Sequence, residues 1–114
     1  MNRLMDTLGE HGADLDGIAE RFLGDEAFYV ECLIEFMQDQ NFEALEKAIE
    51  IQNYTEAFEQ AHALKGVAGN LGLMPLYRAL SDVISALKAK EYDDLELLYQ
   101  TISSYHALYS GLLK

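Results

Sequence analysis

Apolar residues recur along most of the chain at intervals of three and four positions, which is the period of an amphipathic α-helix. The most regular run is the last, with apolar positions at Leu95, Leu98, Ile102, Tyr105, Tyr109 and Leu112. The pattern predicts longer helices over residues 26–51, 54–71, 75–90 and 93–112. Two shorter helices are predicted before them, over residues 2–9 and 14–23.

Residues that favour helix ends separate these segments. Gly24 follows the second short helix, Asp25 can cap the next helix, and Pro75 suits the first turn of another. The apolar pattern of segment 26–51 is interrupted at residues 39–42, so the helix can kink or break there. We therefore expect an all-α fold, namely an antiparallel up-down four-helix bundle with one or two short N-terminal helices covering one end.

Length and composition are typical of one helical domain over residues 1–114. Half of the residues are hydrophobic, which is enough apolar material for a single core. The chain holds one proline, as expected of a helical domain. No apolar stretch is long enough to span a membrane, and residues 1–4 hold no apolar signal core. We therefore predict a cytoplasmic protein, in which the single cysteine, Cys32, is a small buried residue.

The chain is strongly acidic, with 20 Asp and Glu against 8 Lys and Arg and a formal net charge of −12. A charge of this sign argues against binding to nucleic acid or to an anionic membrane surface. It also makes the position of each cation informative, and Lys65 lies three residues after a histidine, His62.

His62 is the candidate for chemistry. The apolar stripe of its helix consists of Ala57, Ala61, Leu64, Ala68 and Leu71. On a helical wheel His62 points away from that stripe by roughly 120° or more, so we expect it outside the core. Gly66 and Gly69 lie close to the same line, although each helical glycine costs about 1 kcal/mol relative to alanine. The pattern indicates an imidazole left open to a bulky group, because a side chain at either glycine is expected to crowd the ring.

Lys65 flanks the line of His62, Gly66 and Gly69. An ammonium group at this place can bind phosphoryl oxygens. An open imidazole, an adjacent lysine and two glycines on the same helix face together favour phosphoryl transfer to a ring nitrogen.

The run from His62 to Gly72 resembles the signature of histidine-containing phosphotransfer (HPt) domains, H-x-L-K-G-x-x-x-N-[LV]-G. The matching residues are His62, Leu64, Lys65, Gly66, Asn70, Leu71 and Gly72. The resemblance implies a phosphorelay intermediate, in which the imidazole Nε2 accepts a phosphoryl group from the aspartyl phosphate of a receiver domain and passes it to another receiver.

The resemblance also implies the partners and the cofactors. The partners would be receiver domains of response regulators or of hybrid histidine kinases, and this chain would act as a monomer. The receiver would supply an acidic pocket, its magnesium and its own lysine. We expect no cofactor or metal on this chain and no ATP-dependent kinase activity of its own.

Under this resemblance His62 is the phosphoacceptor and Lys65 clamps the phosphoryl oxygens. Gly66 and Gly69 keep the docking face free, Asn70 supports the local helix structure, and Gly72 serves the helix end. Phe58, one turn before His62, has two readings at this stage. It is a contact for a receiver helix if it is exposed, or it is partly buried against the neighbouring helix.

Two other functions remain open from the residues. Glu59 and His62 have the i, i+3 spacing of di-iron four-helix bundles, although no second such pair occurs and His62 faces outward. The acidic surface and the wide apolar arc of segment 26–51 are also compatible with a helical adaptor that binds without chemistry. The other histidines, His11 and His106, have no partner in the pattern and are predicted to have no role.

Overall fold

A computed structural model describes residues 3–114, so the predicted helix start at Asn2 lies outside the described residues. The helices are α1 (Arg3–Glu10), α2 (Leu15–Arg21), α3 (Glu26–Met37), α4 (Asn41–Glu50), α5 (Tyr54–Asn70), α6 (Met74–Lys88) and α7 (Leu95–Leu112). An isolated antiparallel bridge joins Ala13 to Leu73, and all other regular structure in the described part is helical. The all-α class is confirmed.

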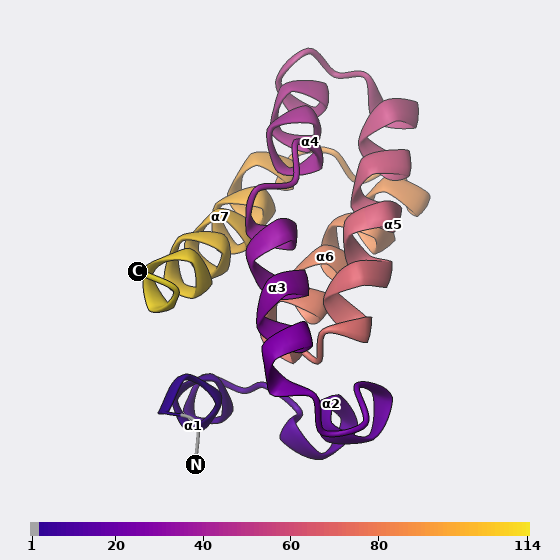
Figure 1. The fold of residues 1–114 in the computed structure, drawn as a ribbon. Coiled ribbons are helices and arrows are strands. Elements are labelled where there is room, and N and C mark those ends of the chain that lie inside the picture. Colours follow the sequence, from indigo (N-terminus) through magenta and orange to yellow (C-terminus); the bar gives the residue numbers. More distant parts are fainter. Residues whose placement is uncertain (1–2) are drawn as a thin grey trace.

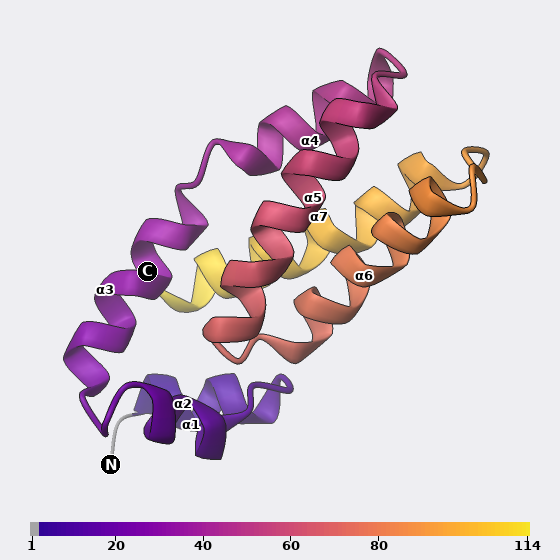
Figure 2. The ribbon, with the colours of Figure 1, turned by 90° about the vertical axis from the view of Figure 1, so that its right-hand side faces the viewer.

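Helices α4 to α7 pack around one core. Helix α4 contacts α5, α5 contacts α6, α6 contacts α7, and α7 contacts α4, so the four helices close on one another, which fits a four-helix bundle (Figure 1). Helices α1 and α2 lie together at one end of the molecule, near the turn that joins α5 to α6 (Figure 2). Among residues 3–114 no helix combines the length and the apolar character that a membrane span requires.

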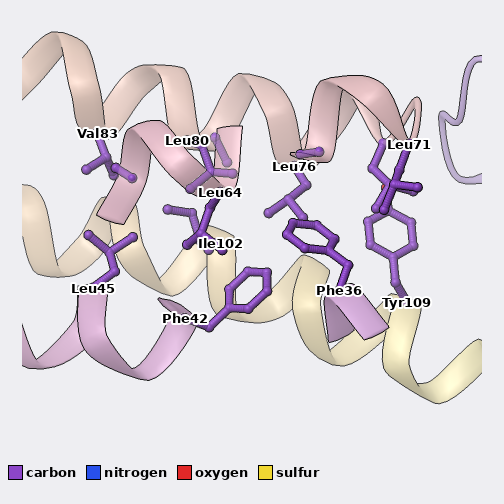
Figure 3. Close-up of a cluster of buried hydrophobic side chains, with 14 of the residues drawn as sticks. Phe36, Phe42, Leu45, Leu64, Leu71, Leu76, Leu80, Val83, Ile102 and Tyr109 are labelled. Carbon is purple, nitrogen blue, oxygen red and sulfur yellow. The ribbon is translucent and has the colours of Figure 1, made fainter. Parts of the chain in front are cut away.

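The core is filled by branched and aromatic side chains that come from different helices. Leu45 of α4, Leu64 of α5, Leu80 of α6 and Ile102 of α7 are all fully buried and face one another (Figure 3). Burial of each such side chain contributes about 1.5–3 kcal/mol to folding. These positions belong to the periodic apolar pattern of the sequence, which is why the pattern predicts the packed faces.

The predicted helix 26–51 is in fact two helices, since α3 ends at Met37 and α4 begins at Asn41. The break falls at the predicted weak point. The Asp39 carboxylate accepts a hydrogen bond from the Asn41 backbone N–H at 2.8 Å, which supports the new helix start. On the other side of the break, His106 of α7 places its Nε2 2.7 Å from the Met37 carbonyl oxygen.

The turn after α5 fastens the N-terminal helices to the bundle. Gly72 has φ +68°, and the Leu73 N–H donates to the Ala68 carbonyl at 3.0 Å, which is a common way to end a helix. The Asp14 N–H donates to the Gly72 carbonyl at 2.9 Å. A Cβ on Gly72 would lie 2.7 Å from Ile18 Cγ1, so helix α2 packs directly on this glycine. The predicted role of Gly72 at the helix end is confirmed.

Candidate functional site

Helix α5 places His62 on the outside of the bundle. Ala57, Ala61, Leu64 and Ala68 are completely buried along one side of α5, whereas the His62 side chain is exposed. The helical wheel predicts this orientation, because His62 lies opposite the apolar stripe. The imidazole is therefore open to a partner molecule.

Phe58 flanks the imidazole one turn earlier on α5. The two rings are roughly parallel, with centroids 6.0 Å apart and an angle of 21° between their planes. Phe58 is half-buried and packs against the core, and the Lys88 Nζ of α6 lies 6.0 Å from its ring centroid. The Phe58 ring thus lies between the imidazole-bearing turn of α5 and a cation of the next helix.

Lys65 flanks the imidazole one turn later on α5. It is half-buried, and its Nζ lies 5.2 Å from the centroid of the Tyr77 ring on α6. This distance is within the range of a cation–π interaction. In a chain with a net charge of −12, Lys65 and Lys88 bring positive charge to both sides of the histidine along α5.

The two glycines near His62 face different surroundings. Gly66 is exposed, and a Cβ built there would meet nothing within 4 Å. A Cβ on Gly69 would lie 3.1 Å from Cδ1 and Cε1 of Tyr77. Gly66 thus leaves open space one turn from the imidazole, as expected, whereas the missing side chain of Gly69 makes room for the Tyr77 ring and not for His62.

Asn70 is the last residue of α5 and is exposed. Its carbonyl oxygen accepts a hydrogen bond from the Arg21 Nε–H of α2 at 2.9 Å, and a cation at this end suits the helix dipole. The next carbonyl, that of Leu71, accepts from the buried Tyr29 hydroxyl of α3 at 2.6 Å. Burial raises the pKa of Tyr29, so the hydroxyl remains a donor. Both bonds fix the end of the helix that carries His62.

Tyr77 and Lys88 were not identified from the sequence, because the motif covers α5 and the turn after it, whereas both residues lie on α6. Helices α5 and α6 are joined by a short turn around residue 73, so residues at equal sequence distances from it come close to each other. Gly69 and Tyr77 are each four residues from this point, and Phe58 and Lys88 are each fifteen. That symmetry is the signal in the sequence that could have paired them.

The surroundings of His62 offer no support for the di-iron alternative. Within residues 3–114, no three or more His, Cys, Asp or Glu side chains gather in a way that could hold a metal ion. Glu59 is exposed, like His62, on the outside of the helix, whereas a metal site of this kind lies between helices in the bundle interior.

Comparison with known protein families gives one match. The family model described as "Hpt domain" matches residues 29–108, which is well over half of the 114-residue chain and includes α4, α5 and α6 in full. No curated protein and no solved structure matches the chain.

Proposed function

The chain belongs to the Hpt domain family, and on that premise we propose that it is a phosphorelay intermediate whose phosphoacceptor is His62. Hpt domains serve histidine phosphotransfer in phosphorelays, interact with receiver domains and have no kinase activity of their own. The observation that carries the assignment is the exposed imidazole of His62 within the matched segment, with open space at Gly66 one turn away.

The proposed reaction is a direct displacement at phosphorus. The lone pair of the His62 Nε2 attacks the phosphorus atom of an aspartyl phosphate on a receiver domain, and a P–N bond forms. The bond from phosphorus to the carboxylate oxygen breaks, and its electron pair leaves with the aspartate. Attack by the carboxylate of a second receiver on the phosphoimidazole reverses these steps, so His62 passes the group on.

Such a transfer requires in-line geometry and neutralisation of charge on the equatorial oxygens. The receiver would contribute its magnesium and its own lysine. This chain would contribute the nucleophile and the Lys65 ammonium, which lies one turn from His62 and binds phosphoryl oxygens as the group moves. It needs no cofactor of its own for these tasks.

The receiver would dock on the outer side of α5, over the solvent-facing parts of Phe58, Gly66, Gly69 and Asn70. Gly66 allows close approach, since no atom occupies the space in front of it. Phe58 contacts the receiver only with its exposed part, because it is half-buried beside His62.

We also assign residues 1–114 to a single monomeric domain, with α4 to α7 in antiparallel up-down order. The two N-terminal helices precede the matched residues. The hydrogen bonds of Asp14 and Arg21 to the end of α5 support their place in the same domain.

Transfer of radiolabelled phosphate from a phosphorylated receiver domain tests the proposal. We expect His62→Gln to keep the helical fold and to accept no label, whereas the matched variant His11→Gln, at an exposed histidine of the α1–α2 turn, accepts label like the parent protein. The label on the parent protein should be acid-labile. Acceptance of label by His62→Gln would overturn the assignment.

A further inference from the structure

We propose that Tyr77 is a positioning residue for phosphotransfer, because its ring lies against Gly69 and holds the ammonium of Lys65, a residue one turn from His62 on α5. The inference deepens the proposed function and rests on it. Two observations carry it: the Lys65 Nζ lies 5.2 Å from the ring centroid, and two ring carbons lie 3.1 Å from where a Cβ on Gly69 would be.

The Lys65 side chain needs a support of this kind. A lysine side chain has four rotatable bonds and a strongly hydrated ammonium group, so an exposed lysine samples many rotamers. Lys65 is half-buried although it lies one turn from the exposed His62 on the same helix. The Lys65 ammonium lies over the ring of Tyr77, which attracts it through the electrons of the ring face.

An aromatic ring is also chemically suited to this task. A carboxylate partner would neutralise the ammonium and compete with the phosphoryl oxygens for its N–H groups. A ring face attracts the cation but carries no net charge, so the full positive charge stays available for the phosphoryl group. The difference between a ring and a carboxylate as a partner matters in this chain, because its 20 acidic residues outnumber its basic ones.

Gly69 is the structural condition for the contact. The distance of 3.1 Å is closer than ordinary van der Waals contact, so a methyl group on residue 69 requires the Tyr77 ring to shift by a few tenths of an ångström. Tyr77 has limited freedom to adapt, because it is half-buried and packs against the core from the first turn of α6. Gly69 and Tyr77 therefore act as a pair that determines where the Lys65 ammonium lies.

The position of Lys65 can be measured without any partner. Protons held over an aromatic face have upfield-shifted NMR resonances, so the Lys65 ε-methylene protons should be shifted in the parent protein. We expect Tyr77→Leu, which keeps apolar volume but removes the ring, to abolish the shift, and Tyr77→Phe to retain it. An unshifted Lys65 resonance in the parent protein, or a shift that survives in Tyr77→Leu, would overturn the proposal.

The kinetic consequence is measured as the rate of label transfer from a phosphorylated receiver. We expect Tyr77→Leu to slow transfer by about two- to fivefold, the effect of losing one exposed cation–π contact, and Tyr77→Phe to restore the rate. In a Lys65→Ala background, Tyr77→Leu should have no further effect. An equal loss with and without Lys65 would show that Tyr77 does not act through the lysine.

Gly69→Ala should change the Lys65 resonance and the rate in the same direction as Tyr77→Leu but by less, because the ring is displaced and not removed. Its matched control is Gly111→Ala, at an exposed helical glycine of α7 where a Cβ meets nothing within 4 Å. A Gly69→Ala protein with unchanged Lys65 resonance would contradict the role of Gly69. If the parent protein accepted no phosphate while the Lys65 shift behaved as described, the proposed function would fail and the placement of Lys65 by Tyr77 would stand.

Discussion

Gly66 and Gly72 belong to the same short motif, yet the structure places opposite demands on them. Gly66 lies within α5, one turn after His62, is exposed, and has free space where a side chain would be. Gly72 follows the end of α5, is buried, has φ +68°, and lies against Ile18 of α2. The motif therefore combines two requirements, an open surface beside His62 and a tightly packed helix end.

The difference extends to the surroundings of the two glycines. Hydrogen bonds from three other parts of the chain hold the end of α5. The donors are Asp14, which precedes α2, Arg21 of α2 and Tyr29 of α3. The centre of α5 presents His62 to solvent between Phe58 and Lys65. Rigidity at one end and access in the middle are what a positioned nucleophile on a helix requires.

The largest effect on stability should come from Gly72→Ala. An alanine must adopt a left-handed conformation there, and its methyl group would lie 2.7 Å from Ile18 Cγ1. We expect the free energy of unfolding to fall by about 2–4 kcal/mol. Urea denaturation followed by circular dichroism measures this loss, and an unfolding midpoint equal to that of the parent protein would remove the contrast between the two glycines.

Tyr29→Phe should have the next largest effect on stability. The variant leaves the buried Leu71 carbonyl without the hydroxyl donor at 2.6 Å, at a cost of about 1–3 kcal/mol in the free energy of unfolding. The parent and the variant are compared by urea denaturation at neutral pH. Equal stability would show that the hydroxyl does not hold the end of α5.

Buried tyrosines also predict a loss of stability at alkaline pH. Burial raises the pKa of Tyr99 and that of Tyr109 to about 12, from 10.0, and it raises that of Tyr29 as well. The unfolded chain therefore releases these protons first, so the contribution of the three tyrosines to stability is fully present below pH 10 and is lost as the pH rises towards 12. Urea midpoints across this range should fall less steeply in Tyr29→Phe and in Tyr99→Phe, and parallel curves would contradict the assignment.

The sequence predicts the parts of this molecule that depend on local pattern. The wheel of α5 separates the buried Leu64 from the exposed His62, and the glycine after Leu71 marks the helix end. The break after Met37 is predicted only as a weak point, because a residue of α7, His106, contacts the carbonyl at which α3 ends. The contact of Tyr77 with Gly69 was missed for the same reason, since it depends on how α6 packs beside α5.

The smallest change in stability, with the clearest separation of stability from function, is expected at Gly66. Gly66→Ala and Gly66→Leu improve helix propensity and meet no neighbouring atom, so each should raise the free energy of unfolding by at most about 1 kcal/mol. Phosphotransfer should respond in the opposite direction. The leucine side chain occupies the space one turn from His62 and should obstruct the receiver, and alanine should do so less.

Urea denaturation and label transfer are measured on the same samples. A leucine variant that transfers phosphate as fast as the parent protein would show that the space in front of Gly66 is not needed for docking, whereas slower transfer in a more stable protein would show that the glycine serves the partner and not the fold.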